Sequence, residues 1–222
     1  MEFFSDLVEY LEINYSTVLE ALRDHLYIGL VPVVIAFVLS LPLGFLVVRY
    51  GWLRVPLLTL SSVLYTIPSL ALILVIPGIL STNILDPNNV VIALTIYGLA
   101  LLVRTTADGL SSIDPLIVQA ATAMGYKPVR RWFAVDLPLA LPVVLSGLRV
   151  ATVASVSMAS IAALVGIGGL GQLFTRGFQL GFYPPPIVIG LVLSVALAVV
   201  ADLVIVLVQR AVTPWTRLRQ GA

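Results

Sequence analysis

Three serine hydroxyls, at Ser155, Ser157 and Ser160, lie close together in an apolar stretch and are the first candidates for covalent chemistry. A serine becomes an effective nucleophile only when a neighbouring base takes its proton. The single histidine, His25, lies outside the stretches expected to form the membrane-embedded bundle, the chain has no cysteine, and no acidic pair is spaced to hold a metal ion. These residues argue against an enzyme and against thiolate or histidine-rich metal sites.

Two opposite charges interrupt otherwise apolar stretches, Arg149 within residues 139–165 and Asp202 within residues 187–208. Each lies about 8–10 residues from the end of its stretch that is expected to face the cytoplasm, which is a depth of ~12–15 Å. An unpaired charge at that depth in a membrane is costly. We therefore expect Arg149 and Asp202 to form an intramembrane ion pair or to share one polar pocket. The alternative is that Arg149 extends to the lipid headgroups while Asp202 faces water alone.

A short helical hairpin is predicted between two apolar stretches, where residues 114–142 read DPLIVQAATAMGYKPVRRWFAVDLPLALP. Asp114 can cap the first helix by accepting a hydrogen bond from a free backbone N–H, and Pro115 suits the first helical position. Gly125 can adopt the left-handed conformation that ends this helix.

The second helix of the hairpin is expected to begin at Pro128 and to end at Leu137-Pro138, because a residue before proline is pushed out of the helical region. One face of this helix would carry Val129, Trp132 and Phe133. Arg130 and Arg131 would point elsewhere. A capped, basic hairpin of this kind suits docking better than catalysis, and an ordinary amphipathic loop is the alternative.

The composition is that of an integral membrane protein. Hydrophobic residues make up 60% of the 222 positions and charged residues 10%, with a mean hydropathy of +1.10, whereas a soluble domain normally carries about 25% charged residues. We expect an all-α fold with about five spans, each near the ~20 residues needed to cross the hydrocarbon. The spans are placed at 26–48, 55–80, 90–110, 139–165 and 187–208.

The chain is expected to form one transmembrane domain, residues 24–210, flanked by an N-terminal segment at 1–23 and a cytoplasmic tail at 211–222. The segment 1–23 has apolar residues at helical spacing with glutamates between them, which predicts a helix that lies at a surface or packs beside the bundle. In the third span the apolar run stops at Arg104, whose guanidinium is expected to snorkel to the membrane interface.

The positions of Lys and Arg predict the orientation, because cytoplasmic segments carry an excess of them. With the N-terminus outside and the C-terminus inside, nine basic residues lie inside and two, Arg23 and Arg176, lie outside. The nine are Arg49, Arg54, Arg104, Lys127, Arg130, Arg131, Arg210, Arg217 and Arg219. This orientation places the hairpin at 114–138 in the cytoplasm.

Small residues recur at every fourth position of the fourth span, namely Gly147, Ala151, Ser155, Ala159 and Ala163. Such a stripe lets helices approach closely; the alternative is a pore-lining face, in which Ser155 would be a candidate for the translocation path. The next stretch, GIGGLGQLFTRG at 166–177, has no preceding strand and is therefore not expected to bind a nucleotide. It is expected to form an external gate or re-entrant turn buried by protein.

The pattern of Ala120-Ala121, Gly125, Val135 and Leu137-Pro138 resembles the EAA loop of binding-protein-dependent ABC importer permeases. In that family the loop forms the coupling helix that sits in a groove of the ATPase subunit. The resemblance implies the type I importer permease fold and an ATPase-coupling surface made of Gln119, Ala120, Ala121, Met124 and Gly125. Gln119 stands where the family usually has a glutamate, which keeps hydrogen bonding and removes a charge.

Other stretches, including YTIPSLAL at 65–72 and VRTTADGL at 103–110, resemble the permeases of osmoprotectant importers, which carry glycine betaine, choline, carnitine and related quaternary amines. Such cations are held by aromatic faces, so Tyr65, Tyr97 and Phe37 become candidates for the translocation path, with packing as their alternative role. Permeases of methionine and other amino-acid importers share much of this architecture and remain an alternative.

The resemblance also implies the partners: an ABC ATPase subunit, a second permease subunit that is identical or different, an external substrate-binding protein and membrane lipid, in the inner membrane of a prokaryote. No nucleic-acid partner is expected, because no basic cluster is interleaved with aromatics. The single lysine, Lys127, lies in GYKP without a glycine-rich loop, so ATP hydrolysis falls to a partner and no cofactor is expected. A secondary transporter or channel, the alternative from another class, would normally show internal repeats or more ionisable groups in its spans.

Overall fold

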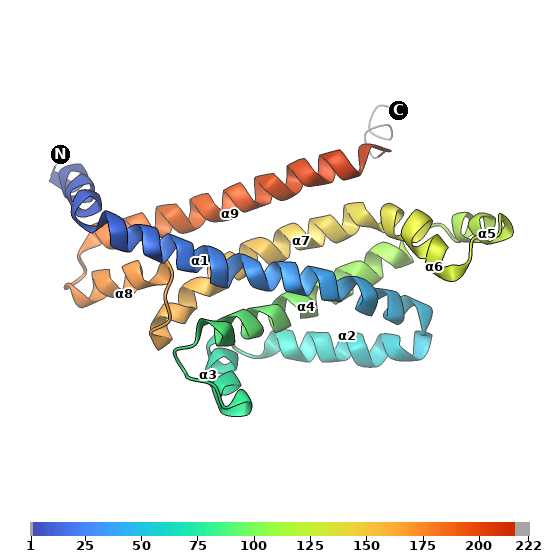
Figure 1. Ribbon diagram of the computed structural model, residues 1–222, viewed down its shortest axis with the longest axis horizontal. Helices are drawn as coiled ribbons and strands as arrows, with labels where there is room; N and C mark the ends of the chain where they lie inside the picture. Colours follow the sequence, from blue (N-terminus) through green and yellow to red (C-terminus); the bar gives the residue numbers. More distant parts are fainter. Residues whose placement is uncertain (1, 216–222) are drawn as a thin grey trace.

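The computed structural model describes residues 2–215. Met1 and residues 216–222 lie outside the described residues, and with them Arg217, Arg219 and most of the predicted tail. Long helices run side by side along the molecule, with the N-terminus at one end and the hairpin of α5 and α6 at the other (Figure 1). The helical elements are α1 (Glu2–Arg49), α2 (Gly51–Thr66), α3 (Ser69–Leu80), α4 (Pro87–Ser111), α5 (Pro115–Ala123), α6 (Pro128–Arg131), η1 (Trp132–Asp136), α7 (Leu137–Ala159), η2 (Ser160–Val165), α8 (Gly171–Gln179) and α9 (Pro184–Val212).

Within the described residues, four helices are long and apolar enough to cross a membrane, and the pair α2–α3 makes a fifth crossing if it is counted as one span. The expected span at 55–80 is not one straight helix, because α2 and α3 meet at an angle of 104°. The break falls at Ile67-Pro68, where Ile67 is extended at φ −67° and ψ 129°. Steric pressure from Pro68 on the preceding residue explains why the apolar run bends at this point.

The N-terminal segment is continuous with the first span in α1. A kink marks Asn14, which has φ −111° and ψ 19° and donates from its side-chain amide to the Tyr10 carbonyl at 3.0 Å. Beyond the kink, Val18 and Ala21 pack with Leu170 of the turn before α8. Of the two positions expected for this segment, packing beside the bundle is therefore the one observed.

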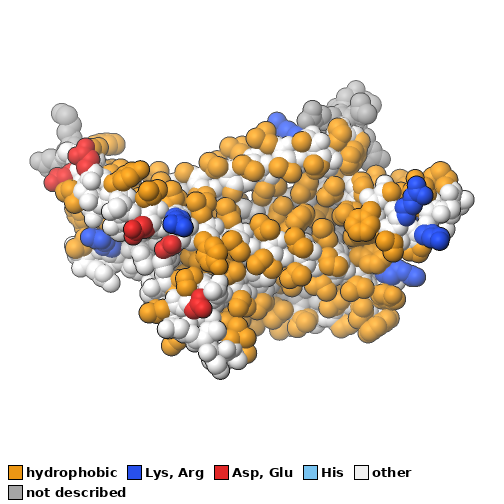
Figure 2. Space-filling view, viewed as in Figure 1, with side chains coloured by type: hydrophobic (Ala, Val, Ile, Leu, Met, Phe, Trp, Pro, Cys, Tyr) orange, Lys and Arg blue, Asp and Glu red, His pale blue; other side chains and the backbone are white. Residues whose placement is uncertain are grey.

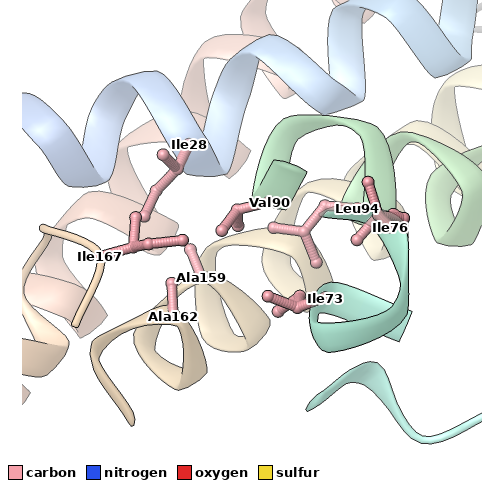
Figure 3. Close-up of a cluster of buried hydrophobic side chains, with 9 residues drawn as sticks. Ile28, Ile73, Ile76, Val90, Leu94, Ala159, Ala162 and Ile167 are labelled. Atoms are coloured by element: carbon pink, nitrogen blue, oxygen red, sulfur yellow. The ribbon is translucent and has the colours of Figure 1, made fainter. Parts of the chain in front are cut away.

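α4 lies at the centre of the bundle and contacts α1, α2, α3 and α7. Figure 3 shows one of the core clusters, in which Ile28, Ile73, Leu94 and Ala162 meet from four different elements. The small-residue stripe of α7 faces this interior: a Cβ on Gly147 would lie 2.5 Å from Thr105 Oγ1, and Ala151, Ser155 and Ala159 are buried. The stripe therefore serves close helix packing inside the chain.

The glycine-rich stretch at 166–177 forms a tight turn followed by α8. Gly166 and Gly169 have φ of +82° and +105°, a region that favours glycine because it has no Cβ. The turn is protein-covered, since Ile167 and Leu170 are buried. This agrees with the expected irregular element whose backbone is shielded by the bundle.

The surface has a broad apolar belt between two charged ends (Figure 2). On the face shown in Figure 2, Lys and Arg side chains gather at the α5–α6 end, and the visible Asp and Glu side chains lie toward the opposite, N-terminal end. The hairpin and the N-terminus thus lie on opposite sides of the belt, as the predicted orientation requires.

Candidate functional site

The first helix of the hairpin is built as its sequence predicts. Asp114 Oδ1 accepts a hydrogen bond from the Leu116 N–H at 2.8 Å, Pro115 occupies the first turn, and Gly125 is left-handed at φ +82°. The Tyr126 N–H donates to the Ala121 carbonyl at 3.2 Å, which closes the helix end in the way glycine-terminated helices do. These contacts define both ends of α5, a nine-residue helix at the tip of the molecule.

α5 presents an apolar outer face. Met124 is 71% exposed, and Gln119, Ala120 and Gly125 are also exposed, whereas Ala121 is only 2% exposed and packs inward. The Ala121 side chain is therefore not available for contact at the α5 surface. Other apolar side chains of the hairpin region are exposed but were not assigned to the coupling surface from the sequence, namely Leu116 and Ile117 of α5, Val129 of α6 and Phe133 of η1.

The expected end of the second hairpin helix at Leu137-Pro138 is wrong. α6 passes through the wider π-helical turn η1 directly into α7, and Pro138 lies in the first turn of α7, where a missing N–H is tolerated. Val129, Trp132 and Phe133 do not share one face either. Trp132 is buried against Phe45 with ring centroids 4.7 Å apart, while Val129 and Phe133 face outward.

Arg131 braces the hairpin to the body of the protein. Its Nη1 donates to Thr122 Oγ1 of α5 at 3.1 Å, and its Nε donates to Asp136 Oδ2 of η1 at 3.2 Å. The second carboxylate oxygen, Oδ1, is buried without a hydrogen-bond partner. Thr122 and Asp136 were not selected from the sequence; only the π-helical turn brings Asp136 back toward Arg131.

Three of the four residues expected to line a translocation path lie together. Tyr65 of α2, Tyr97 of α4 and Ser155 of α7 line one narrow gap between these helices, and the tyrosine rings meet edge to face with centroids 5.8 Å apart. Tyr97 Oη is buried without a partner, whereas Ser155 Oγ donates to the Gly29 carbonyl at 2.7 Å. Phe37 lies elsewhere, packed in the core with Ala36, Leu102 and Ala151.

His25 lies inside the bundle, contrary to the expectation that placed it outside. The Leu170 N–H donates to Nδ1 at 3.2 Å, which assigns the proton to Nε2, and Nε2 lies 3.1 Å from the Val156 carbonyl. Both ring nitrogens thus bond to backbone groups of other segments, and Ser155 Oγ is bonded to a carbonyl. His25 is a cross-link between helices, so no serine nucleophile is activated by it.

Arg149 and Asp202 meet between α7 and α9. Nε and Nη2 of Arg149 donate to the two oxygens of Asp202 at 2.7 and 2.9 Å. The side chains keep 41% and 25% of their surface exposed, on a stretch where α9 shows an apolar surface outward. The contact therefore joins α7, which precedes the glycine-rich stretch at 166–177, to α9, which follows it.

The profile of one protein family, the binding-protein-dependent transport system inner membrane component, matches residues 36–214. The chain belongs to this family. As a permease, it is 33% identical over 214 residues to the glycine betaine/carnitine/choline transport system permease protein OpuCD of Bacillus subtilis, covering 96% of this chain and 92% of that protein. It is also 33% identical over 211 residues to the osmoprotectant import permease protein OsmW of Salmonella typhimurium, covering 94% and 98%.

The permease also resembles solved transporter structures. An inward-facing MetNI methionine ABC transporter chain matches with a TM-score of 0.81 and 25% identity, covering 91% of this chain and 99% of that one. An amino-acid ABC transporter chain has a TM-score of 0.75 at 19% identity and shows the shared fold alone. The permease is therefore a multi-pass subunit of the type I ABC importer fold that works with a separate ATPase and another permease subunit.

Proposed function

We propose that this permease forms the translocation path of an ATP-driven importer for osmoprotectants such as glycine betaine, choline or carnitine. The observation that carries the proposal is the similarity over nearly the whole chain to permeases named for these substrates, at 33% identity for two of them. The gap lined by Tyr65 and Tyr97 adds chemical support, because aromatic rings attract quaternary ammonium groups.

In this proposal the coupling surface is the exposed side of α5 with Gln119, Ala120, Met124 and Gly125, which docks on the ATPase subunit at the cytoplasmic side. Closure of the ATPase dimer carries α5 with it. Because Arg131 ties α5 to η1, the displacement passes into α7 and its packed neighbours, which switch between inward-open and outward-open arrangements. An external binding protein delivers substrate at the N-terminal end of the bundle, in the inner membrane of a prokaryote.

A permease of a methionine or amino-acid importer is the second candidate, favoured by the similarity to the MetNI structure at 25% identity. The two are separated by transport measurements. The permease is reconstituted in liposomes with the ATPase and binding protein encoded beside it, and ATP-dependent uptake of labelled glycine betaine, carnitine, choline and methionine is compared. Uptake of at least one quaternary amine supports the proposal. Uptake of methionine without any quaternary amine would overturn it.

A further inference from the structure

A cavity of about 340 Å³ adjoins the tyrosine gap on the side of the hairpin. Its polar lining comes from Ser61, Ser62 and Tyr65 of α2 and from Arg104 and Thr105 of α4. Tyr65 lines both this cavity and the narrow gap, so the two spaces lie on either side of its ring. The cavity therefore has both a positively charged side chain and an aromatic ring in its lining.

Arg104 does not snorkel toward the end of α4. Its Nη2 donates to Ser62 Oγ of α2 at 3.3 Å. Measured along α4, Arg104 lies ~10 Å closer to the hairpin than Tyr97 does. Measured along α2, Ser62 lies only ~4–5 Å closer to the hairpin than Tyr65 does. Because Tyr65 and Tyr97 are in contact, the guanidinium leans back toward the tyrosines to reach Ser62. Helical side chains tilt toward the N-terminus of their helix, and that direction in α4 leads away from the hairpin.

Within the part of the chain that the structure describes, Arg131 and Arg149 form ion pairs with Asp136 and Asp202, whereas the Arg104 guanidinium has no carboxylate partner. An ionisable group within an apolar helix normally pairs or marks a substrate pathway. Arg104 is exposed and lines the cavity, so its remaining N–H donors can serve an anionic group placed there.

The opposite end of the cavity suits a cation. The Tyr65 side chain is 47% exposed, and α2 ends directly after it at Thr66, where the chain bends by 104° into α3. The C-terminal end of a helix carries a partial negative charge, and an aromatic face adds cation–π attraction. The Arg104 guanidinium, held at Ser62, and the Tyr65 ring are thus separated by about one helical turn along α2.

We propose that this cavity is a translocation subsite for zwitterionic quaternary amines, with Arg104 holding the carboxylate and Tyr65 the trimethylammonium group. Ser62 positions Arg104: its Oγ accepts from Arg104 while donating to the Leu58 carbonyl at 3.0 Å. Glycine betaine and carnitine carry both groups. Choline carries a hydroxyl in place of the carboxylate and has a net positive charge, which Arg104 repels. This inference rests on the proposed function and narrows it, because it makes Arg104 the residue that favours betaine over choline.

The test is ATP-driven uptake of labelled glycine betaine and choline by the complete reconstituted importer carrying Arg104→Gln, Arg104→Lys or Ser62→Ala. Arg104→Gln should slow betaine uptake about 10-fold or more, because it removes hydrogen bonds from a charged donor to the carboxylate. Choline uptake should stay the same or rise. Arg104→Lys should retain part of the betaine rate, because it keeps the charge but loses the planar fork. Arg54→Gln, at an exposed arginine of α2 outside the cavity, is the matched control.

Binding is measured separately on the purified permease–ATPase complex without binding protein, as the shift in melting temperature caused by glycine betaine or by choline. Betaine should stabilise the wild type more than choline, and Arg104→Gln should remove that difference. Equal losses of betaine and choline uptake, or an unchanged betaine rate, would overturn the subsite. If Arg104→Gln reaches the membrane poorly, Ser62→Ala decides, since it should lower betaine uptake selectively. A wild type that imports no quaternary amine overturns the proposed function itself, which distinguishes the two failures.

Discussion

Arg149 of α7 and Asp202 of α9 are joined by two hydrogen bonds of 2.7 and 2.9 Å although 53 residues separate them in the chain. Both lie on helices with otherwise apolar surroundings. Paired in this way, each supplies the counter-charge that the other would need in a membrane. The contact ties the last helix to the centre of the bundle.

We predict that Arg149→Met or Asp202→Leu alone lowers the membrane level of the permease and its transport rate several-fold, because each leaves one charge uncompensated. The double variant Arg149→Met, Asp202→Leu should recover much of the loss, since an apolar pair can replace an ion pair in a low-dielectric setting. Immunoblots of membranes and uptake assays measure both effects. If the two single defects simply add in the double variant, the residues are not energetic partners.

The second prediction concerns Gly125 at the end of α5. Its φ of +82° is strained for other residues although a Cβ there would meet no atom within 4 Å. Gly125→Val should therefore distort the exposed end of α5 at a cost of about 1–3 kcal/mol and uncouple ATP hydrolysis from transport without preventing membrane insertion. Gly125→Asn is the matched control, because asparagine tolerates the left-handed conformation. Wild-type uptake in a normally inserted Gly125→Val variant would remove the coupling role.

The brace formed by Arg131 gives a third prediction. Thr122→Val removes the acceptor of the 3.1 Å hydrogen bond between Arg131 and α5, whereas Thr122→Ser keeps it. We expect Thr122→Val to lower transport per ATP hydrolysed about 3-fold or more, which corresponds to ~0.7 kcal/mol and lies within the usual net range of one hydrogen bond. Thr122→Ser should behave as wild type. The ratio of substrate transported to phosphate released is the measurement. Identical ratios in both variants would contradict transmission through Arg131.

The orientation is tested by cysteine labelling, which is clean because the chain has no native cysteine. Asn88, at the start of α4, and Arg130, in the hairpin, are both exposed. A cysteine at Asn88 should react with an impermeant thiol reagent added to intact cells, and one at Arg130 only after permeabilisation. The reverse pattern would overturn both the orientation and the cytoplasmic docking of α5.

Features set by short-range interactions were predictable from the sequence. The Asp114 cap, the first-turn Pro115 and the left-handed Gly125 involve residues a few positions apart, so local geometry and hydrogen bonding determine them. Apolar runs locate the spans for a similar reason. In lipid each helix satisfies its backbone groups within its own segment, so a span is recognisable from that segment's sequence. Arg149 and Asp202 became candidates for an ion pair because counting residues from the cytoplasmic end of each span gives them the same depth.

Features that depend on how helices rotate and pack against one another required the tertiary structure. An aromatic ring within a predicted span made Phe37 a candidate beside Tyr65 and Tyr97. The packing places Phe37 in a core cluster, whereas the two tyrosines line a common gap. The π-helical turn carries the chain past Leu137-Pro138 and rotates Trp132 inward. Arg104 leans toward the bend between α2 and α3 because Ser62 of another helix holds it there. The rotation of each helix about its axis is set by the close-packed contacts of all its neighbours, and these neighbours are remote in sequence.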